Sequence, residues 1–265
     1  MIQSLNSPHV VRVKALIGTR GVKERKAAGL FVAEGLQCVR EALVATAGPV
    51  IETLYLTANG RAKIEQSFQL SDVKCVDVSD EVMQEMSETI TPQGILAVCI
   101  IPKLDFTSIT LNGSSKFIYL AEVQDPGNAG TILRSADAFA MDAVITSPGS
   151  VDMYSPKVVR STAGSLWHIP VFEDVKIQEL LKLKLQAFSL GAQGAIKLNE
   201  YQVSGDCVAV FGNEARGLAT SQQVADIEVV SIPMPGNAES LNLSTAATIV
   251  MYHLANMPAS QSSSR

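Results

Sequence analysis

The sequence predicts an α/β protein whose C-terminal part is built on a parallel β-sheet. Short runs rich in Val, Ile and Phe alternate with helical patterns from residue 117 to residue 254. This alternation is typical of strands joined by helices that cover both faces of a parallel sheet. The 265 residues are 47% hydrophobic and 18% charged, which provides enough apolar material for one large domain or two modest ones.

The N-terminal part predicts a smaller α/β unit that precedes this sheet. Val10, Val13, Leu16 and Ile17 recur at the spacing of one helix face. After this helix we expect a strand and a helix within 29–43, strands at 50–57 and 74–79, a helix at 80–89 and a buried strand at 94–102. Pro102 stops that last strand.

The C-terminal part predicts six strands and four helices in near alternation. We expect strands at 117–123, 142–148, 168–172, 186–192, 207–212 and 227–234, and helices at 128–140, 155–164, 175–184 and 243–254.

Two breaks in the pattern suggest the domain boundaries. Asn112-Gly113 and the two serines after it indicate a linker, and the terminal stretch ASQSSSR has the composition of a disordered tail. The predicted parts are an N-terminal domain at 1–102, a linker at 103–115, a C-terminal domain at 116–258 and a tail at 259–265.

Composition and charge exclude several classes of function. The net charge of −5 argues against a protein that coats DNA, although residues 1–40 hold seven basic and only two acidic side chains. No apolar run approaches the ~20 residues that span a bilayer, and the N-terminus lacks an apolar signal core. We therefore expect a cytoplasmic protein without a membrane partner. The four cysteines form no CxxC pair and the three histidines lack metal-ligand spacing, which predicts reduced thiols and no metal.

Three loops that follow predicted strands carry unusual residues. They are DPGNAGTILR (125–134), FGNEARGL (211–218) and IPMPGNAESLNLS (232–244). Ligands of open parallel sheets bind at the carboxyl ends of the strands, so we expect these loops to meet at one site. None of them matches a dinucleotide fingerprint, a P-loop or the glycine loop of common methyltransferases, and an NAD-linked oxidoreductase is disfavoured for that reason.

Each loop also has a structural interpretation without chemistry. Asn128 is a residue type that caps helices, and Asn242 or Ser240 is suited to a second cap. Arg134 is suited to a surface ion pair, and Glu214 to the favourable field at a helix start. The joint occurrence of the three loops at strand ends favours a binding site over these separate interpretations.

Together the three loops resemble the motifs of the SpoU/TrmH family of RNA ribose 2′-O-methyltransferases, within the SPOUT superfamily. The motif N-x-G-x-x-x-R occurs at Asn128–Arg134, G-x-E-x-x-G-(L/M) at Gly212–Leu218, and I-P-M-x-G-x-x-x-S-L-N-x-S at Ile232–Ser244. The resemblance covers about residues 117–256. A looser resemblance links SPHVVRVKAL and FVAEGLQCVREAL to the RNA-recruiting domain that precedes many members.

The resemblance implies a deep trefoil knot within residues 206–256, S-adenosylmethionine bound in a bent shape, and a homodimer formed through the C-terminal domain. It implies cofactor contacts by Leu190, Gly191, Gly212, Asn213, Ile232, Met234, Ser240 and Leu241. It assigns catalytic or supporting roles to Asn128, Arg134, Glu214, Ser240 and Asn242. The family proposal makes the arginine the base that acts on the ribose hydroxyl. Because arginine normally stays protonated, an anchoring and polarising role for Arg134 stays open beside it.

Basic residues in two segments are candidates for binding RNA phosphates, with plain solvated surface as the alternative. They are Arg12, Lys14, Arg20, Lys23, Arg25, Lys26, Lys157 and Arg160. The N-terminal domain favours ribosomal RNA over transfer RNA as the substrate. A catalytically silent RNA-binding member of the fold and a base-modifying member of the superfamily are the remaining alternatives.

Overall fold

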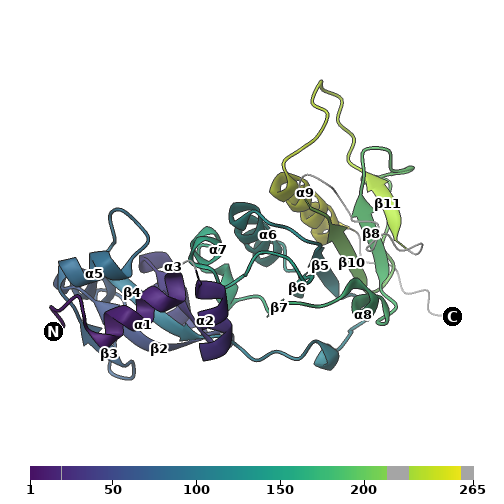
Figure 1. The fold of residues 1–265 in the computed structure, drawn as a ribbon. Helices are drawn as coiled ribbons and strands as arrows, with labels where there is room; N and C mark the ends of the chain where they lie inside the picture. Colours follow the sequence, from purple (N-terminus) through teal and green to yellow (C-terminus); the bar gives the residue numbers. More distant parts are fainter. Residues whose placement is uncertain (19, 214–226, 258–265) are drawn as a thin grey trace. The chain divides into compact units, whose positions relative to one another are not determined.

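The computed structural model describes residues 1–18, 20–213 and 227–257. They form two compact units (Figure 1). Unit 1 comprises Met1–Lys103 and Asp152–His168, and unit 2 comprises the described residues of Leu104–Val151 and Ile169–Arg265. The chain therefore passes between the units three times. The predicted tail falls within 258–265 and lies outside the described residues.

Unit 1 is built on a four-stranded sheet with strand order β1-β4-β2-β3. Strand β4 pairs antiparallel with β1 and β2, whereas β2 and β3 are parallel. Its strands are β1 (Leu30–Glu34), β2 (Val50–Leu56), β3 (Cys75–Asp77) and β4 (Ile95–Ile100). Its helices are α1 (Pro8–Ile17), α2 (Gly21–Ala28), α3 (Leu36–Val44), α4 (Ala58–Ile64), α5 (Asp80–Met86), α7 (Pro156–Ser161) and the 3-10 turn η2 (Ser165–Trp167).

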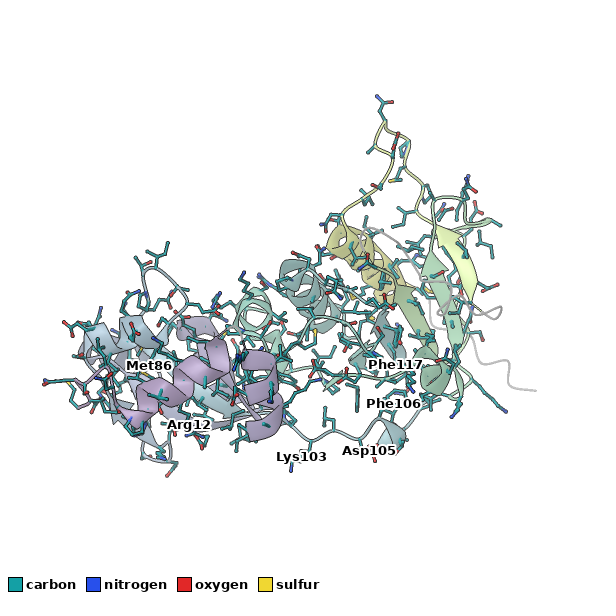
Figure 2. The ribbon with its side chains drawn as sticks, in the orientation of Figure 1. Arg12, Met86, Lys103, Asp105, Phe106 and Phe117 are labelled. Atoms are coloured by element: carbon teal, nitrogen blue, oxygen red, sulfur yellow. The ribbon has the colours of Figure 1, made fainter. Side chains whose placement is uncertain are left out.

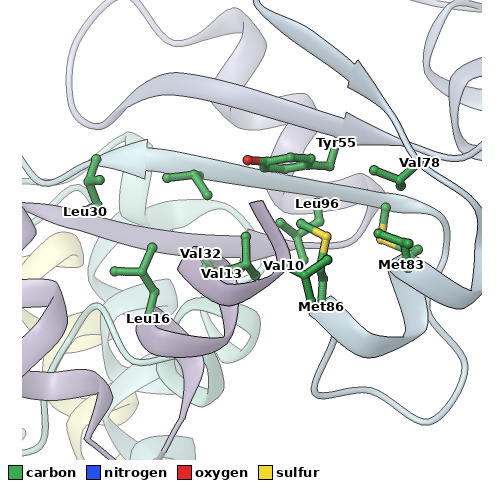
Figure 3. Packing of buried hydrophobic residues seen from close by; sticks show 12 residues of the cluster. Val10, Val13, Leu16, Leu30, Val32, Tyr55, Val78, Met83, Met86 and Leu96 are labelled. Carbon is green, nitrogen blue, oxygen red and sulfur yellow. The ribbon is translucent and has the colours of Figure 1, made fainter. Parts of the chain in front are cut away.

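One core cluster of unit 1 lies between the sheet and the helices α1 and α5. The apolar face of α1 that the sequence predicted is buried, with Val10, Val13 and Leu16 almost fully covered. Figure 3 shows these side chains beside Val32 and Leu96 of the sheet. Each buried aliphatic side chain of this kind stabilises the fold by roughly 1.5–3 kcal/mol.

The segment Asp152–His168 contributes to the interior of unit 1. Arg25 donates from Nε and Nη2 to Oδ2 of Asp152, at 2.8 and 2.6 Å. The indole Nε1 of Trp167 donates to the carbonyl of Pro49 at 3.0 Å, and its ring lies 6.0 Å from that of Phe31. An ion pair and an indole that are buried need these partners, so the segment is integral to unit 1.

Unit 2 contains the parallel sheet that the sequence predicted. Its seven strands are ordered β7-β6-β5-β10-β8-β11-β9, and every pairing is parallel. The strands are β5 (Lys116–Leu120), β6 (Ala143–Thr146), β7 (Val171–Phe172), β8 (Gln186–Leu190), β9 (Ile196–Lys197), β10 (Cys207–Phe211) and β11 (Glu228–Ser231). The helices are α6 (Pro126–Ala138), α8 (Ile177–Leu181), α9 (Leu243–Asn256) and the 3-10 turn η1 (Phe106–Ser108).

Several elements differ in length from the sequence prediction. Strand β11 stops at Ser231, because Pro233 has no N–H to continue the ladder. Helix α8 spans only Ile177–Leu181, and Lys184 has a left-handed backbone with φ of 55°. Helices α2 and α4 were not predicted from the sequence. Each has only one large apolar side chain, Val22 in α2 and Ile64 in α4, so no apolar face marks it in the sequence.

The predicted linker is partly packed in unit 2. It contains η1, which begins at Phe106 (labelled in Figure 2). The ring of Phe106 makes an edge contact with that of Phe172, at 5.9 Å between ring centroids. Ile109 and Leu111 also pack against the core cluster of unit 2.

Among the described residues, the helices are too short or too polar to cross a membrane.

Candidate active site

A pocket of about 400 Å³ opens at the carboxyl ends of three neighbouring strands of unit 2. Leu190 and Gly191 reach it from the end of β8, Gly212 and Asn213 from the end of β10, and the chain after β11 closes the remaining side. Strands β10, β8 and β11 are consecutive in the sheet. The loops that follow these strands meet at one edge of the sheet, as expected from the sequence, because the strands are neighbours and run in the same direction.

The structure brings all eight predicted cofactor residues to this pocket. They are Leu190, Gly191, Gly212, Asn213, Ile232, Met234, Ser240 and Leu241. Asn128 and Asn242, two of the predicted catalytic residues, also line it. The pocket thus joins the first and third motifs with the start of the second.

A side chain at Gly191 would crowd a neighbouring residue of β11. A Cβ atom at this position would lie 2.7 Å from Cγ1 of Val229 on β11. The glycine donates its N–H to the carbonyl of Val230 at 3.0 Å. This close approach of the chain after β8 to β11 keeps one wall of the pocket as bare backbone.

Two asparagines connect helices α6 and α9 at the pocket. Asn242 is the N-cap of α9, where its Oδ1 accepts from the backbone N–H groups of Ser244 and Thr245. Its Nδ2 donates to Oδ1 of Asn128 at 3.1 Å. The cap interpretation for Asn242 is correct, and the same side chain also binds the first motif.

Asn128 does not cap its own helix. The N-cap of α6 is Asp125, whose carboxylate accepts from the backbone N–H of Asn128 at 2.7 Å. The side chain of Asn128 is thereby left to accept from Asn242. About two turns further along each helix, Ser135 and Thr248 are joined at 2.8 Å by their hydroxyl groups, which adds a second link between α6 and α9.

Asn213 ties the loop after β10 to the loop after β5. Its Nδ2 donates to the carbonyl of Glu122 at 2.9 Å, and the N–H of Glu122 donates to Oγ of Ser147 at 2.9 Å. Glu122 has a φ of 54°, an unfavourable backbone for a residue with a side chain. These bonds hold that backbone beside the pocket.

Arg134 lies on the exposed stripe of α6 with Thr131 and Ala138. Among the described residues it has no hydrogen bond or ion pair, and it is not part of the pocket wall. The surface ion pair considered for it is therefore not formed with any described residue. Glu214, the acid of the second motif, lies outside the described residues.

The pocket has the chemistry of a site for S-adenosylmethionine. Apolar side chains such as Leu190, Ile232 and Leu241 suit a purine face, and Asn128, Ser240 and Asn242 offer neutral polar groups for hydroxyls. The volume lies within the range of small-molecule sites. The residues present fit a nucleoside-containing cofactor.

Comparison with known proteins agrees with this geometry. Residues 115–252 match the SpoU rRNA Methylase family, and residues 9–97 match the MRM3-like substrate binding domain. The chain belongs to the SpoU rRNA methylase family. The 23S rRNA (guanosine(2553)-2′-O)-methyltransferase RlmP of Bacillus subtilis is 33% identical over 88% of this chain and 91% of its own length.

Two further methyltransferases align over most of the chain. The 23S rRNA (uridine(2479)-2′-O)-methyltransferase of Streptomyces viridochromogenes is 27% identical over 90% of this chain and 86% of its own length. The AdoMet-bound rRNA methyltransferase from Sinorhizobium meliloti is 26% identical, with a TM-score of 0.82 and coverage of 96% of both chains.

The basic residues of this SpoU family member differ in availability. Arg25 is buried against Asp152, so its guanidinium does not face solvent. Arg12 pairs with Glu52 at 2.6 Å, and Lys14 pairs with Glu85. These pairs leave the three side chains less free to meet phosphates than the sequence suggested.

Other basic side chains stand at the surface of unit 1. The side chains of Arg20 and Lys23 are exposed and make no hydrogen bond or ion pair with a described residue, and Lys26 is exposed as well. On α7, Lys157 is exposed, whereas Arg160 lies 3.5 Å from Glu34 and 3.2 Å from Glu88. Arg20, Lys23 and Lys157 are therefore the cations best placed to bind a polyanion.

Sequence reasoning missed one polar residue of the pocket wall. Glu239 lines the pocket directly before Ser240, Leu241 and Asn242. Its position inside the third motif could have indicated that it lies at the pocket. It was missed because the motif allows any residue at this position. Ala192, Val210, Phe211, Leu243 and Ala246 complete the wall without polar side chains.

Proposed function

We propose that this protein is an S-adenosylmethionine-dependent RNA methyltransferase that methylates a ribose 2′-hydroxyl in ribosomal RNA. The observation that carries this proposal is the pocket at the ends of β8, β10 and β11, with Asn128 joined to Asn242 at its rim. When bound, the cofactor supplies a methyl group on a positively charged sulfur. The chain must hold that methyl in line with the ribose oxygen.

The residues around the pocket divide this task. Backbone and apolar groups at Gly191, Gly212 and Leu241 hold the cofactor, and Asn128 with Asn242 fixes the rim that faces the ribose. Arg134 is exposed and free of protein partners among the described residues, so its fork of donors is available to an RNA phosphate. It anchors that phosphate and polarises the hydroxyl.

The transfer forms an O–CH₃ bond as the S–CH₃ bond breaks, and the hydroxyl proton leaves. Because a guanidinium offers only hydrogen-bond donors, a phosphate oxygen or water accepts this proton. Glu214 completes the site from the second motif in this proposal.

Ribosomal RNA is favoured as the substrate by two findings. The relatives named above are 23S rRNA and rRNA methyltransferases, and residues 9–97 match a substrate binding domain. Arg20, Lys23 and Lys157 then contribute phosphate contacts from unit 1. Transfer RNA is the alternative substrate.

The proposal also includes a homodimer, a trefoil knot and a cytoplasmic location. Ile249 and Tyr252 of α9 are exposed apolar side chains beside a hollow of about 700 Å³ that also includes Pro233 and Met257. Such a surface suits a second copy of the chain. The knot would involve residues 206–256, part of which lies outside the described residues.

Transfer of labelled methyl from S-adenosylmethionine to purified ribosomal RNA and to bulk transfer RNA tests the proposal. Wild type is compared with Arg134→Ala. Label in ribosomal RNA alone, and only with wild type, is the expected result. Absence of cofactor binding by calorimetry would refute the assignment of the pocket.

A further inference from the structure

Glu239 is the one ionisable residue among the described residues that line the pocket. The rest of the described wall consists of apolar residues, glycines, asparagines and a serine. Among these residues no lysine or arginine is present to neutralise a carboxylate. The described wall therefore carries a single negative charge.

The backbone that carries Glu239 is held from its C-terminal side. Asn242 caps α9 and binds Asn128, three residues after Glu239. The side chain of Glu239 itself is exposed and has no hydrogen bond or ion pair with a described residue. Its carboxylate thus has no structural task within the described part of unit 2.

The ligand that belongs in this pocket, on the function proposed above, changes its charge during the reaction. The sulfur of S-adenosylmethionine carries a permanent positive charge. After methyl transfer the sulfur of S-adenosylhomocysteine is a neutral thioether. A carboxylate on the pocket wall attracts the first species more strongly than the second.

We propose that Glu239 is the counter-charge that makes the pocket prefer the sulfonium cofactor over its demethylated product. The preference draws the cofactor into the pocket and is lost once the methyl group has moved, which favours release of the product. The rival interpretation is a solvated carboxylate at the pocket mouth that affects neither ligand.

Isothermal calorimetry on the full chain separates these interpretations. The ligands are S-adenosylmethionine, S-adenosylhomocysteine and sinefungin, which has an ammonium group in place of the sulfonium. Wild type is compared with Glu239→Gln, Glu239→Asp and a control, Glu200→Gln, which removes an exposed carboxylate outside the pocket wall.

Glu239→Gln is expected to weaken both positively charged ligands about fivefold, the effect of one partly screened charge pair, and the neutral product less than about twofold. Glu239→Asp retains the preference, and Glu200→Gln resembles wild type. In wild type, the preference for S-adenosylmethionine over S-adenosylhomocysteine also decreases as the salt concentration rises. In Glu239→Gln the ratio of the two affinities does not depend on salt.

Equal weakening of S-adenosylmethionine and S-adenosylhomocysteine by Glu239→Gln would overturn the inference, as would no weakening of either. Both results leave the proposed function intact, because wild type still binds the cofactor. If wild type binds none of the three ligands, the proposed function fails and the role of Glu239 fails with it. Unchanged thermal unfolding of Glu239→Gln excludes a folding defect as the cause.

Discussion

The side-chain amide of Asn242 donates to Oδ1 of Asn128 across 3.1 Å, and so joins residues 114 positions apart in the chain. The orientation of the Asn242 amide is set by its role as a cap, because Oδ1 faces the N–H groups of Ser244 and Thr245. Its NH₂ group is thereby turned toward the first motif. Helix capping and the alignment of two motifs depend on one side chain.

This double role predicts different outcomes for two substitutions of Asn242. Asn242→Asp keeps the oxygen that caps α9 and replaces the donor with a second oxygen, which repels Oδ1 of Asn128. We expect methyl transfer to fall at least about tenfold with little change in Tm. Asn242→Ala also removes the cap and is expected to lose about 1 kcal/mol of stability. Thermal unfolding and single-turnover methyl transfer are the measurements.

The partner position provides the matching test. Asn128→Ala removes the acceptor, and we expect it to lower turnover more than cofactor affinity because pocket walls formed by Ile232 and Leu241 remain. Equal losses in turnover and in affinity would assign Asn128 to cofactor binding instead. Near wild-type activity of Asn242→Asp would show that the bond between the two asparagines is dispensable.

Arg134 predicts a loss of activity without a loss of stability. The side chain is exposed and makes no hydrogen bond or ion pair with a described residue. Arg134→Lys replaces a planar fork by a point charge, so turnover should fall by about tenfold or more. The Tm and the S-adenosylmethionine affinity should stay at wild-type values. Turnover close to wild type would remove Arg134 from the site.

The ion pair between Arg25 and Asp152 predicts a large effect on stability. Its side chains are 4% and 8% exposed. Asp152→Ala leaves the Arg25 charge buried without its carboxylate, and we expect unit 1 to lose about 3–5 kcal/mol. Urea unfolding followed by the fluorescence of Trp167 measures this, because Trp167 is the single tryptophan and is buried in unit 1.

Glu52→Gln is the control for this prediction. Its partner Arg12 is 38% exposed, and pairs of this kind contribute less than about 1 kcal/mol. The bond from Arg12 lowers the pKa of Glu52. The stability from this pair is therefore present above the ordinary pKa of the carboxyl and is lost as the pH falls through its lowered value. If Asp152→Ala and Glu52→Gln both lowered the free energy of unfolding by a similar small amount, the ion pair between Arg25 and Asp152 would not be buried in solution.

The sequence predicted the elements whose pattern is local. The alternating strands of 117–212 and the apolar face of α1 follow directly from side-chain spacing, and strand-end loops of parallel strands converge for geometric reasons. That geometry predicts that the loops meet at one site, whereas the individual pocket residues from Leu190 to Asn242 were expected from the family resemblance. The stop of β11 before Pro233 shows where chain chemistry shortens a predicted strand.

Contacts between distant segments could not be predicted from local patterns. Arg25 looked like a surface cation because its partner Asp152 is 127 residues away. The segment Asp152–His168 follows a strand of the parallel sheet in sequence, yet it packs with the N-terminal unit. Pairing partners of this kind are set by tertiary packing, which single-sequence periodicity does not contain.

Burial predicts the order in which the thiols react. It raises the pKa of Cys38 to about 11 and that of Cys207 to about 12. Cys75 is only partly buried. Alkylation of the native protein at about pH 8 should therefore modify Cys75 first, because thiolate formation and access both control the rate. Mass spectrometry of digested samples gives the order, and fast labelling of Cys38 would contradict it.

The same burial predicts how stability responds to alkaline pH. A thiol whose pKa is raised in the folded state stabilises the fold fully below its unfolded pKa, and this contribution is lost as the pH rises through the folded value. For Cys38 the loss falls between the ordinary thiol pKa of 9.0 and the raised pKa of about 11. Cys38→Ala should flatten the decline of the unfolding free energy over this interval, measured by urea unfolding, and an unchanged slope would contradict the prediction.

Unequal availability of the basic side chains predicts which of them set the salt dependence of RNA binding. The side chains of Arg20 and Lys23 are exposed and make no hydrogen bond or ion pair with a described residue, whereas Arg12 and Lys14 each face a carboxylate. Each phosphate contact contributes about 0.7–0.9 to the slope of log K against log salt. Arg20→Ala/Lys23→Ala should lower the slope by about 1.5, and Arg12→Ala/Lys14→Ala by less than about 0.5. Filter binding of a ribosomal RNA fragment at several salt concentrations measures both slopes. If the two double variants lower the slope equally, the carboxylate partners do not withhold Arg12 and Lys14 from RNA.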